Sequence, residues 1–185
     1  LSQILPGLAF ILIAWDHYLV RKLEMLPILR LALFEPDIPQ NTAALLRTCG
    51  CLGVACEIIE PCGFIFSCKH MRRAGMDYLD KVALTHHKDW ETFQSNYRGD
   101  RRILLTTKAV KPYTSFTFRA GDILIMGRES AGAPDFVHAQ VEERLTIPMM
   151  PGMRSLNIAA SAAIVIAEAL RQLNAFPKTE AMRNA

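Results

Sequence analysis

Three short segments of this chain hold the residue types that bind and transform polar ligands. The first spans residues 39–47 and contains Asn41 and Arg47, six positions apart, soon after an apolar run. In an open α/β sheet, ligands bind in the crevice at the carboxyl ends of the strands. An amide and a guanidinium there suit a phosphate or a ribose, although a capping Asn and a solvated Arg would explain the same pair.

The second segment, residues 126–134, contains a G-x-E-x-x-G pattern from Gly127 to Gly132. Its glycines let the backbone come close to a ligand, and the carboxylate of Glu129 can accept hydrogen bonds from a cation or an amide. The pattern is neither the G-x-G-x-x-G of dinucleotide-binding folds nor a P-loop, which disfavours a nicotinamide-dependent oxidoreductase. A tight strand-to-helix turn without a ligand would also explain it.

The third segment, residues 147–157, is a loop rich in Pro, Gly and Met that leads into an apolar helix. The free N–H groups at the start of a helix favour anionic or electron-rich groups. Ser155 is suited to cap this helix, which leaves the polar Asn157 unexplained at the head of an apolar segment. Ser155 and Asn157 are more than ordinary caps if they also face the ligand crevice.

The elements that position these segments are an alternation of apolar strands and helices. Pro39 favours a helix start, and Gly50 or Gly53 favours its end. The alternation predicts an α/β fold with a mainly parallel sheet flanked by helices. We expect strands at 28–34, 54–59, 102–107, 122–127 and 145–147, helices at 39–50 or 39–53, 90–97 and 155–173, and a loop with a short helix at 64–81.

The last predicted helix is apolar or small on every side between Ile158 and Ala167. A helix without a polar face is buried on all sides, either deep in a core or between subunits. A chain of 185 residues has little interior in which to hide such a helix. We therefore expect a homodimer that forms through the final helix.

The composition of the chain is that of a globular protein. It is 51% apolar and 21% charged, with a net charge of +3, and its length corresponds to about one domain. No apolar run approaches the ~18 residues of a spanning helix, so we expect no membrane partner. Five cysteines lie between residues 49 and 68 without C-x-x-C spacing, which indicates reduced thiols in a cytoplasmic protein and no metal site. We expect an appended segment at 1–26, one catalytic domain at 27–175 and a polar tail at 176–185.

Taken in order, the three segments resemble the SPOUT superfamily of methyltransferases. The resemblance covers about residues 28–173 and includes N-x-x-x-x-x-R, G-x-E-x-x-G-x-P and I-P-M-x-P-x-x-R-S-x-N. Residues 35–42 and 72–78 more narrowly resemble the small enzymes that 2′-O-methylate the wobble nucleotide of tRNA, a cytidine or a modified uridine.

This resemblance implies a fold, a cofactor and a site. The implied fold has a C-terminal trefoil knot, and the implied protein is a homodimer that binds S-adenosylmethionine in the knot, without a metal. The residues that match the cofactor-binding positions are Leu105, Thr106, Gly127, Ile147, Met149 and Ser155. Those that match the active-site positions are Asn41, Arg47, Glu129, Ser155 and Asn157.

The implied reaction transfers the sulfonium methyl group to a ribose 2′-hydroxyl. Arg47 is often given the role of base in such enzymes, but a guanidinium stays protonated at neutral pH. We therefore expect Arg47 to clamp the adjacent phosphate and to stabilise the developing negative oxygen. The tRNA phosphates are expected to meet the basic residues Lys69, Arg72, Arg73 and Lys108. Two alternatives are methylation of another tRNA position or of ribosomal RNA, and a knotted RNA-binding protein without catalysis.

Overall fold

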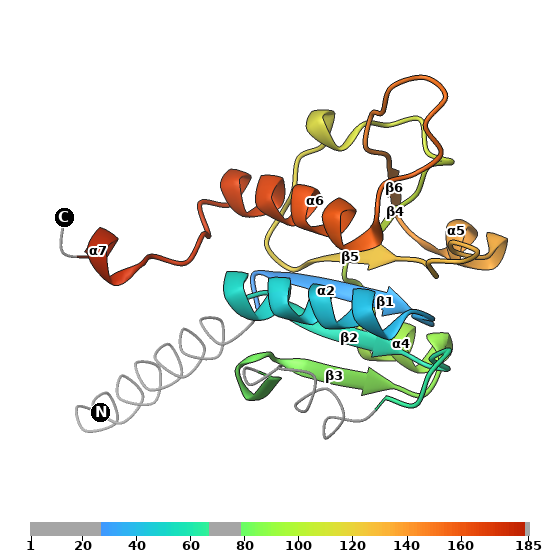
Figure 1. The fold of residues 1–185 in the computed structure, drawn as a ribbon, viewed down its shortest axis with the longest axis horizontal. Helices are drawn as coiled ribbons and strands as arrows, with labels where there is room; N and C mark the ends of the chain where they lie inside the picture. Colours follow the sequence, from blue (N-terminus) through green and yellow to red (C-terminus); the bar gives the residue numbers. More distant parts are fainter. Residues whose placement is uncertain (1–26, 67–78, 184–185) are drawn as a thin grey trace, which may run out of the picture.

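Six parallel strands form the centre of the computed structural model, which describes residues 27–66 and 79–183 (Figure 1). The order across the sheet is β3-β2-β1-β5-β4-β6. This confirms the predicted α/β class with a parallel sheet. The strands are β1 (Leu29–Phe34), β2 (Ala55–Ile59), β3 (Leu84–His87), β4 (Arg102–Leu105), β5 (Asp122–Met126) and β6 (Glu143–Leu145).

Helices cover both faces of the sheet, so its central strands are buried on both sides, as parallel sheets require. The helices α2 (Pro39–Leu52) and α6 (Ile158–Gln172) pack side by side on one face (Figure 1). The shorter α4 (Trp90–Asn96) and α5 (Asp135–Gln140) cover the other. Short turns of helix form η1 (Leu79–Lys81), η2 (Tyr113–Ser115) and α7 (Glu180–Arg183), and α7 lies away from the sheet.

The two long helices begin and end where local chemistry dictates. Pro39 opens α2, and Gly53 closes it with a φ of 68°, a left-handed conformation that glycine adopts without strain. The N-cap of α6 is Asn157 rather than the predicted Ser155, because the Asn157 side chain accepts hydrogen bonds from the N–H groups of Ala159 and Ala160. The helix therefore begins at Ile158, three residues later than predicted.

Apart from the short turns η2 and α7, two elements were not predicted from the sequence. The strand β3 has the sequence LTHH, which lacks an apolar run because β3 is an edge strand that is partly exposed. The six-residue helix α5 begins after Pro134 and buries only Val137. A single buried position does not produce the apolar periodicity by which a helix is recognised in a sequence. The short last strand was predicted at 145–147, and β6 lies at Glu143–Leu145 instead. Most of the predicted loop and helix at 64–81 lies outside the described residues.

The final helix is not buried on all sides within one chain. Ala162, Val165 and Ile166 pack into the core, whereas Ala160 and Ile164 are exposed. The apolar composition therefore corresponds to one face on α2 and the sheet and one strip facing outward. No helix in the described part of the chain is both long and apolar enough to cross a membrane.

The cysteines of the described ranges are used in two ways. Cys49 on α2 and Cys56 on β2 are buried thiols in the core between the helices and the sheet. Cys51 is exposed and Cys62 is half-buried. Within residues 27–66 and 79–183, no group of three or more His, Cys, Asp and Glu side chains is placed to hold a metal ion.

Candidate active site

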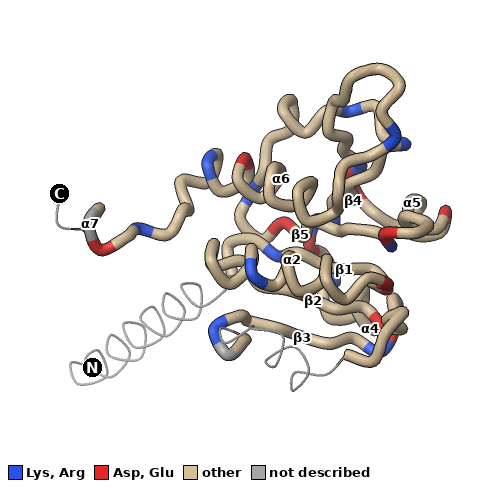
Figure 2. The backbone as a smooth tube through the Cα atoms, in the orientation of Figure 1, with Lys and Arg blue, Asp and Glu red and all other residues tan. Residues whose placement is uncertain are grey.

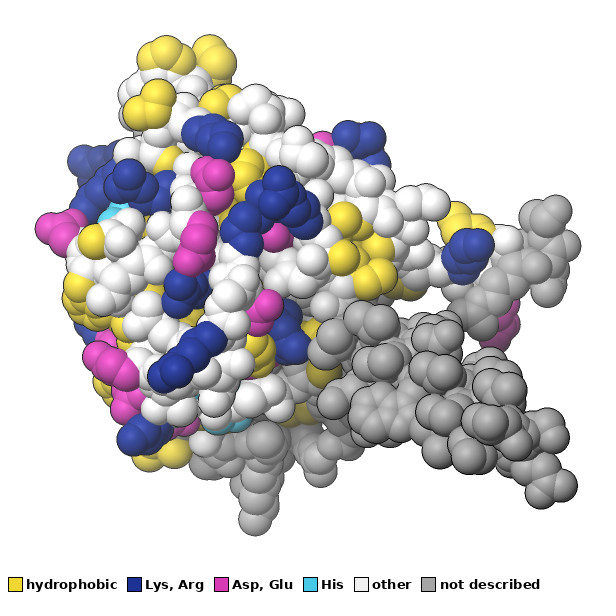
Figure 3. Space-filling model, turned by 180° about the vertical axis from the view of Figure 1, so that it is seen from behind, with side chains coloured by type: hydrophobic (Ala, Val, Ile, Leu, Met, Phe, Trp, Pro, Cys, Tyr) yellow, Lys and Arg dark blue, Asp and Glu magenta, His cyan; other side chains and the backbone are white. Residues whose placement is uncertain are grey.

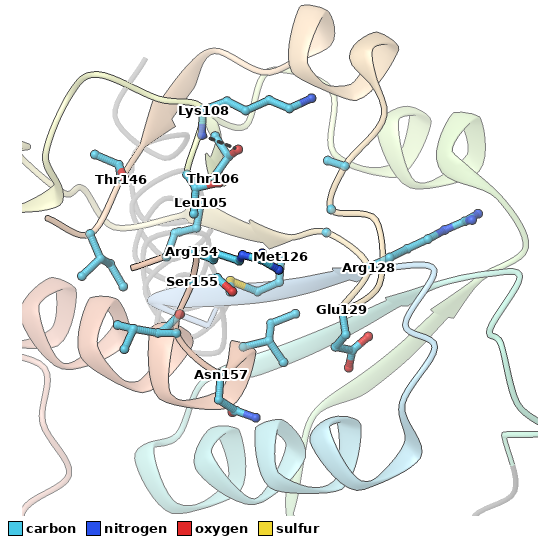
Figure 4. A pocket seen from close by; sticks show the side chains of 18 of the residues that line it. Leu105, Thr106, Lys108, Met126, Arg128, Glu129, Thr146, Arg154, Ser155 and Asn157 are labelled. Carbon is cyan, nitrogen blue, oxygen red and sulfur yellow. Dashed lines mark hydrogen bonds between the residues drawn. The ribbon is translucent and has the colours of Figure 1, made fainter. Parts of the chain in front are cut away.

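The carboxyl ends of four strands meet at one edge of the sheet and open into a cavity. The register of the sheet places Leu33, Met126, Leu105 and Leu145 level with one another, so the loops that follow these strands leave from the same edge. The loops after β4, β5 and β6 line a cavity of about 550 Å³, together with the loop before α6 and Asn41 on α2 (Figure 4). This is the position at which α/β sheets bind their ligands, and the volume lies in the range of small-molecule sites.

The cavity collects nearly all of the residues that the sequence nominated. It is lined by each of the expected cofactor-binding positions, Leu105, Thr106, Gly127, Ile147, Met149 and Ser155. It is also lined by four of the five expected catalytic positions, Asn41, Glu129, Ser155 and Asn157. Apolar side chains at the strand ends alternate with hydroxyl groups and backbone polar groups along the loops, a mixture suited to an adenosine and an amino acid moiety.

Gly127 is required by the close packing of its own loop. A Cβ atom at Gly127 would lie 2.4 Å from the nitrogen of Ala133 and 2.5 Å from the carbonyl carbon of Gly132. The backbone of residues 127–133 therefore folds back on itself, and Arg128 and Gly132 exchange backbone hydrogen bonds of 3.2 and 2.8 Å. This turn leaves backbone groups at the carboxyl end of β5 facing the cavity without an intervening side chain, which suits a bound cofactor.

Two asparagines join the first and last helices at the edge of the cavity. The Asn157 amide donates a hydrogen bond of 3.0 Å to Oδ1 of Asn41 on the first turn of α2. The Oδ1 of Asn157 meanwhile caps α6. One side chain thus fixes the start of α6 against the start of α2, which explains the polar residue at the head of an apolar helix.

Asp37 connects the loop after β1 to the loop after β5. Its N–H donates to Oε2 of Glu129 at 3.1 Å, and the N–H of Glu129 donates to Oδ1 of Asp37 at 3.1 Å. The other carboxylate oxygen of Asp37 accepts from the N–H and the hydroxyl of Ser130. Next to this ladder, Arg128 forms an ion pair with Glu35.

The two carboxyls of this ladder have opposite pKa shifts. Hydrogen bonding with Glu129, opposed by burial and assisted by Ser130, lowers the pKa of Asp37. Burial, followed by the interaction with Asp37, raises the pKa of Glu129 above its usual range. Asp37 is therefore the stronger acid of the pair, and Glu129 is the stronger base.

Basic side chains flank the opposite part of the cavity. Lys108 and Arg154 line it and are exposed, and Lys and Arg lie on the loops beside β4 (Figure 2). Lys108 is 3.7 Å from Asp135 in an exposed ion pair. His138 on α5 also lines the cavity, and burial together with Lys108 and Arg144 lowers the pKa of its imidazole. The wall therefore suits an anionic group such as a phosphate or a carboxylate.

One predicted residue does not line the cavity, and three others lie outside the described residues. Arg47 lies on the exposed side of α2, six residues beyond Asn41, and is not among the described residues that line it. Lys69, Arg72 and Arg73 lie outside the described residues. Lys108 is the member of the expected RNA-binding set that the structure places at the cavity.

Sequence reasoning missed three residues of this site. Arg154 belongs to the third segment and could have been found from its place one residue before Ser155. Asp37 lies two residues before Pro39 in the first segment, but its partner is 92 residues away and no local pattern indicates it. His138 lies on α5, and because that helix was not predicted, neither was this residue.

Comparison with known proteins identifies the family. The sequence matches the SpoU rRNA Methylase family over residues 28–167. A relative from Beijerinckia indica, named tRNA (cytidine(34)-2′-O)-methyltransferase, is 57% identical over 80% of this chain and 94% of its own length. A relative of the same name from Ancylobacter novellus is 43% identical over 82% of this chain and 97% of its own.

A solved structure gives the same result for the fold. It is described as giving structural insights into the 2-OH methylation of C/U34 on tRNA, and it is 37% identical, with a TM-score of 0.75. The similarity covers 80% of this chain and 97% of that one. Sequence, fold and cavity agree, and the chain belongs to the SpoU methylase family.

Proposed function

We propose that this protein transfers a methyl group from S-adenosylmethionine to the ribose 2′-hydroxyl of the wobble nucleotide in the anticodon loop of tRNA. The observation that carries the proposal is the cavity at the carboxyl ends of β4, β5 and β6, where residues of the three motif segments meet. The names of the relatives, tRNA (cytidine(34)-2′-O)-methyltransferases, support a cytidine or uridine at position 34 as the target.

The cavity fits the cofactor that SpoU methylases use. S-adenosylmethionine supplies an electrophilic methyl group on a sulfonium sulfur when it is bound. Leu105, Ile147 and Met149 would contact its apolar parts, and Thr106 and Ser155 would pair with its polar groups. The close turn at Gly127 would bring backbone groups against it.

On the RNA side, Asn41 and Asn157 would orient the target ribose, because their hydrogen-bonded pair lies at the edge of the cavity nearest α2. Positioning the 2′-oxygen in line with the methyl group is a large part of the catalysis available to such an enzyme. In this proposal Arg47 clamps the neighbouring phosphate and stabilises developing negative charge on the oxygen. Lys108, with Lys69, Arg72 and Arg73, binds the phosphates of the tRNA.

The charge distribution favours the cavity side as the RNA-binding surface. The face seen in Figure 3 carries Lys and Arg side chains interspersed with Asp and Glu. A mixed face of this kind gives no strong net attraction for a polyanion. The cavity wall instead carries the exposed basic residues Lys108 and Arg154.

We also propose that the enzyme is a homodimer that packs through α6. The outward strip of this helix includes Ile164, which is 37% exposed, and Leu156 just before the helix is 43% exposed. Burying such a strip against its copy is favourable by about 25 cal/mol for each Å² of apolar surface. Ile164→Glu should produce monomers in sedimentation velocity, and an unchanged dimer would argue against this interface.

The remaining parts of the proposal concern the whole chain. Residues 27–175 would form the methyltransferase domain, with 1–26 as an appended segment and 176–185 as a tail. After β6 at the sheet edge the chain returns to pack α6 beside α2, an arrangement that supports a trefoil knot in this region. The enzyme would act in the cytoplasm, where tRNA is modified.

The test is methyl transfer from labelled S-adenosylmethionine to tRNA, followed by nuclease digestion and nucleoside analysis. We expect label in 2′-O-methylcytidine or a 2′-O-methyluridine at position 34. A matched transcript with 2′-deoxyribose at position 34 should accept no label, because the reacting hydroxyl is missing. Label in ribosomal RNA or at another tRNA position would replace the proposed substrate, and cofactor binding without transfer would indicate a non-catalytic RNA-binding protein.

A further inference from the structure

Transfer of a methyl group to a hydroxyl releases a proton, and a group near the 2′-oxygen must take it. The titratable side chains that line the described part of the cavity are Lys108, Arg128, Glu129, His138 and Arg154. Lysine and arginine are protonated at neutral pH and accept no further proton. The two candidates among these residues are therefore Glu129 and His138.

The positions of these two residues in the cavity differ. His138 belongs to the basic part, where Lys108 and Arg144 act on its imidazole. The carboxyl of Glu129 points toward the start of α2, on the side of the cavity where Asn157 also faces α2 (Figure 4). Asn157 bonds Asn41 there, so Glu129 shares the end of the cavity at which the target ribose is placed.

The hydrogen bonds of Glu129 leave one of its oxygens available. Oε2 accepts from the N–H of Asp37 at 3.1 Å. Oε1 is buried and has no hydrogen-bond partner among the described residues. A buried carboxylate oxygen without a partner is costly, and a catalytic role is one of the reasons for which native proteins retain such a group.

We propose that Oε1 of Glu129 accepts the proton of the ribose 2′-hydroxyl, an assignment that rests on the proposed function. In this step the O–H bond breaks and its proton moves to Oε1. An electron pair of the 2′-oxygen forms the new bond to the methyl carbon, and the electrons of the broken carbon–sulfur bond remain on sulfur. The products are a 2′-O-methyl ribose, a neutral thioether and a protonated Glu129, which returns its proton to solvent.

Asp37 is a positioning residue in this scheme. Its backbone N–H fixes one oxygen of Glu129, and its carboxylate is held by the N–H groups of Glu129 and Ser130. This leaves the other oxygen of Glu129 at a defined place. Burial, followed by the interaction with Asp37, also raises the pKa of Glu129, which makes it a stronger base than an ordinary carboxylate.

Other charges act on Glu129 from the elements around it. Asp37 faces it from the loop after β1, and the Arg128–Glu35 ion pair lies beside it. Across the cavity are the basic groups Lys108, His138 and Arg154. Asp37 makes the direct contact with Glu129, so its removal should change the titration of Glu129 the most.

The first experiment compares Glu129→Gln with wild type in single-turnover methyl transfer to tRNA. Gln keeps the size of the side chain and an oxygen for the N–H of Asp37, but it cannot take the proton. We expect the rate to fall about 10²–10⁴-fold, the usual contribution of a general base. The dissociation constant of S-adenosylhomocysteine should stay within about threefold of wild type, because binding does not need the proton transfer. Glu91→Gln, an exposed residue on α4, is the matched control.

The outcomes separate this assignment from the proposed function. If wild type methylates tRNA and Glu129→Gln is equally fast, the proton-acceptor role is wrong and the proposed function stands. If wild type transfers no methyl group to any RNA, the proposed function fails and the role of Glu129 fails with it.

A second variant distinguishes a base from a merely structural carboxyl. Asp37→Asn removes the negative neighbour, so the pKa of Glu129 should fall. The acid limb of the pH–rate profile should then move to lower pH. An acid limb that stays in place in Asp37→Asn would contradict the assignment. An acid limb that disappears in His138→Gln and persists in Glu129→Gln would identify His138 as the acceptor instead.

Discussion

Two glutamates, one on a strand of the sheet and one in the loop after another strand, have opposite environments. Glu57 on β2 is fully buried, and both of its oxygens are paired, with Arg30 at 2.7 Å and with His87 at 2.9 Å. Glu129, after β5, is half-buried and has one oxygen without a partner among the described residues. The first carboxylate is enclosed by its partners, whereas the second belongs to a residue that lines a cavity and has a buried oxygen without a partner among the described residues.

Two further residues complete the hydrogen-bond network around Glu57. Nδ1 of His87 pairs with the Asn96 amide at 3.2 Å, and Arg30 donates to the Tyr97 hydroxyl at 3.2 Å while lying over its ring. A buried polar network whose groups are all paired specifies a packing arrangement. The contrast teaches that burial alone does not indicate function, and that the informative sign is a buried acceptor without a donor.

The largest effect we predict is the loss of stability in Glu57→Ala. Removing Glu57 leaves the charge of Arg30 uncompensated and the buried His87 ring without its hydrogen-bond partner, which should cost about 3–5 kcal/mol in the free energy of unfolding. Urea denaturation measures this cost, with the exposed Glu91→Ala as control. Methyl transfer per folded molecule should be unchanged. A loss of less than about 1 kcal/mol would mean that the network around Glu57 does not stabilise the fold, and the contrast with Glu129 would then fail.

Gly127→Ala should instead lose ligand binding. Its Cβ would meet backbone atoms at 2.4 and 2.5 Å, so the loop that lines the cavity must shift. We expect affinity for S-adenosylhomocysteine, measured by calorimetry, to fall at least about tenfold, which corresponds to about 1.4 kcal/mol. The matched control is Gly99→Ala, where the φ of 89° is strained for alanine but nothing lies near the new Cβ. That variant should lose stability and keep binding, and equal losses of binding in both would contradict the role of Gly127.

Asn157 allows its two roles to be measured separately. Asn157→Ala removes the N-cap of α6 and should cost about 1 kcal/mol of stability. Asn157→Asp retains a capping oxygen but cannot donate to Asn41. We therefore expect thermal unfolding of the Asp variant to be close to that of wild type, together with slower methyl transfer. If the Asp variant transfers methyl groups at the wild-type rate, the Asn41–Asn157 bond has no part in orienting the ribose.

The smallest effect concerns pH and stability. The folded-state pKa of Glu129 is raised above its unfolded value, so its contribution to stability is present at low pH and is lost as pH rises through the folded pKa. Glutamine does not titrate, so the stability of Glu129→Gln relative to wild type should increase as the pH rises from 4 to 8. We expect a higher Tm at pH 8, by about 1–3 °C, and no gain at pH 4. If the Tm of Glu129→Gln minus that of wild type decreases as the pH rises, folding lowers the pKa of Glu129 instead of raising it.

The sequence was sufficient for the fold class and for most of the site, because the apolar strands and the motif loops are local patterns. Buried strands such as β1 and β5 read as continuous apolar runs, and Pro39 and Gly53 mark the ends of α2. The edge strand β3 was missed because two histidines and a threonine occupy its four positions. Edge strands need little apolar surface, so their sequences resemble those of loops.

The ladder between Asp37 and Glu129 could not be predicted from local patterns. Each residue lies in a motif segment, but their reciprocal hydrogen bonds depend on the pairing of β1 with β5, which brings together positions 92 residues apart. The N-cap of α6 was misplaced for a related reason. Ser155 and Asn157 are both good caps, and the choice of Asn157 is coupled to its contact with Asn41 on another helix.

The hydrogen bond between Asn41 and Asn157 spans 116 positions of the chain and has a consequence for biosynthesis. During translation, Asn41 is synthesised 116 positions before Asn157, the residue that donates a hydrogen bond to it. The nascent chain is therefore unable to methylate RNA until its last motif loop has been translated and has docked. Each new molecule would pass through a period in which it is already folded in part and still inactive.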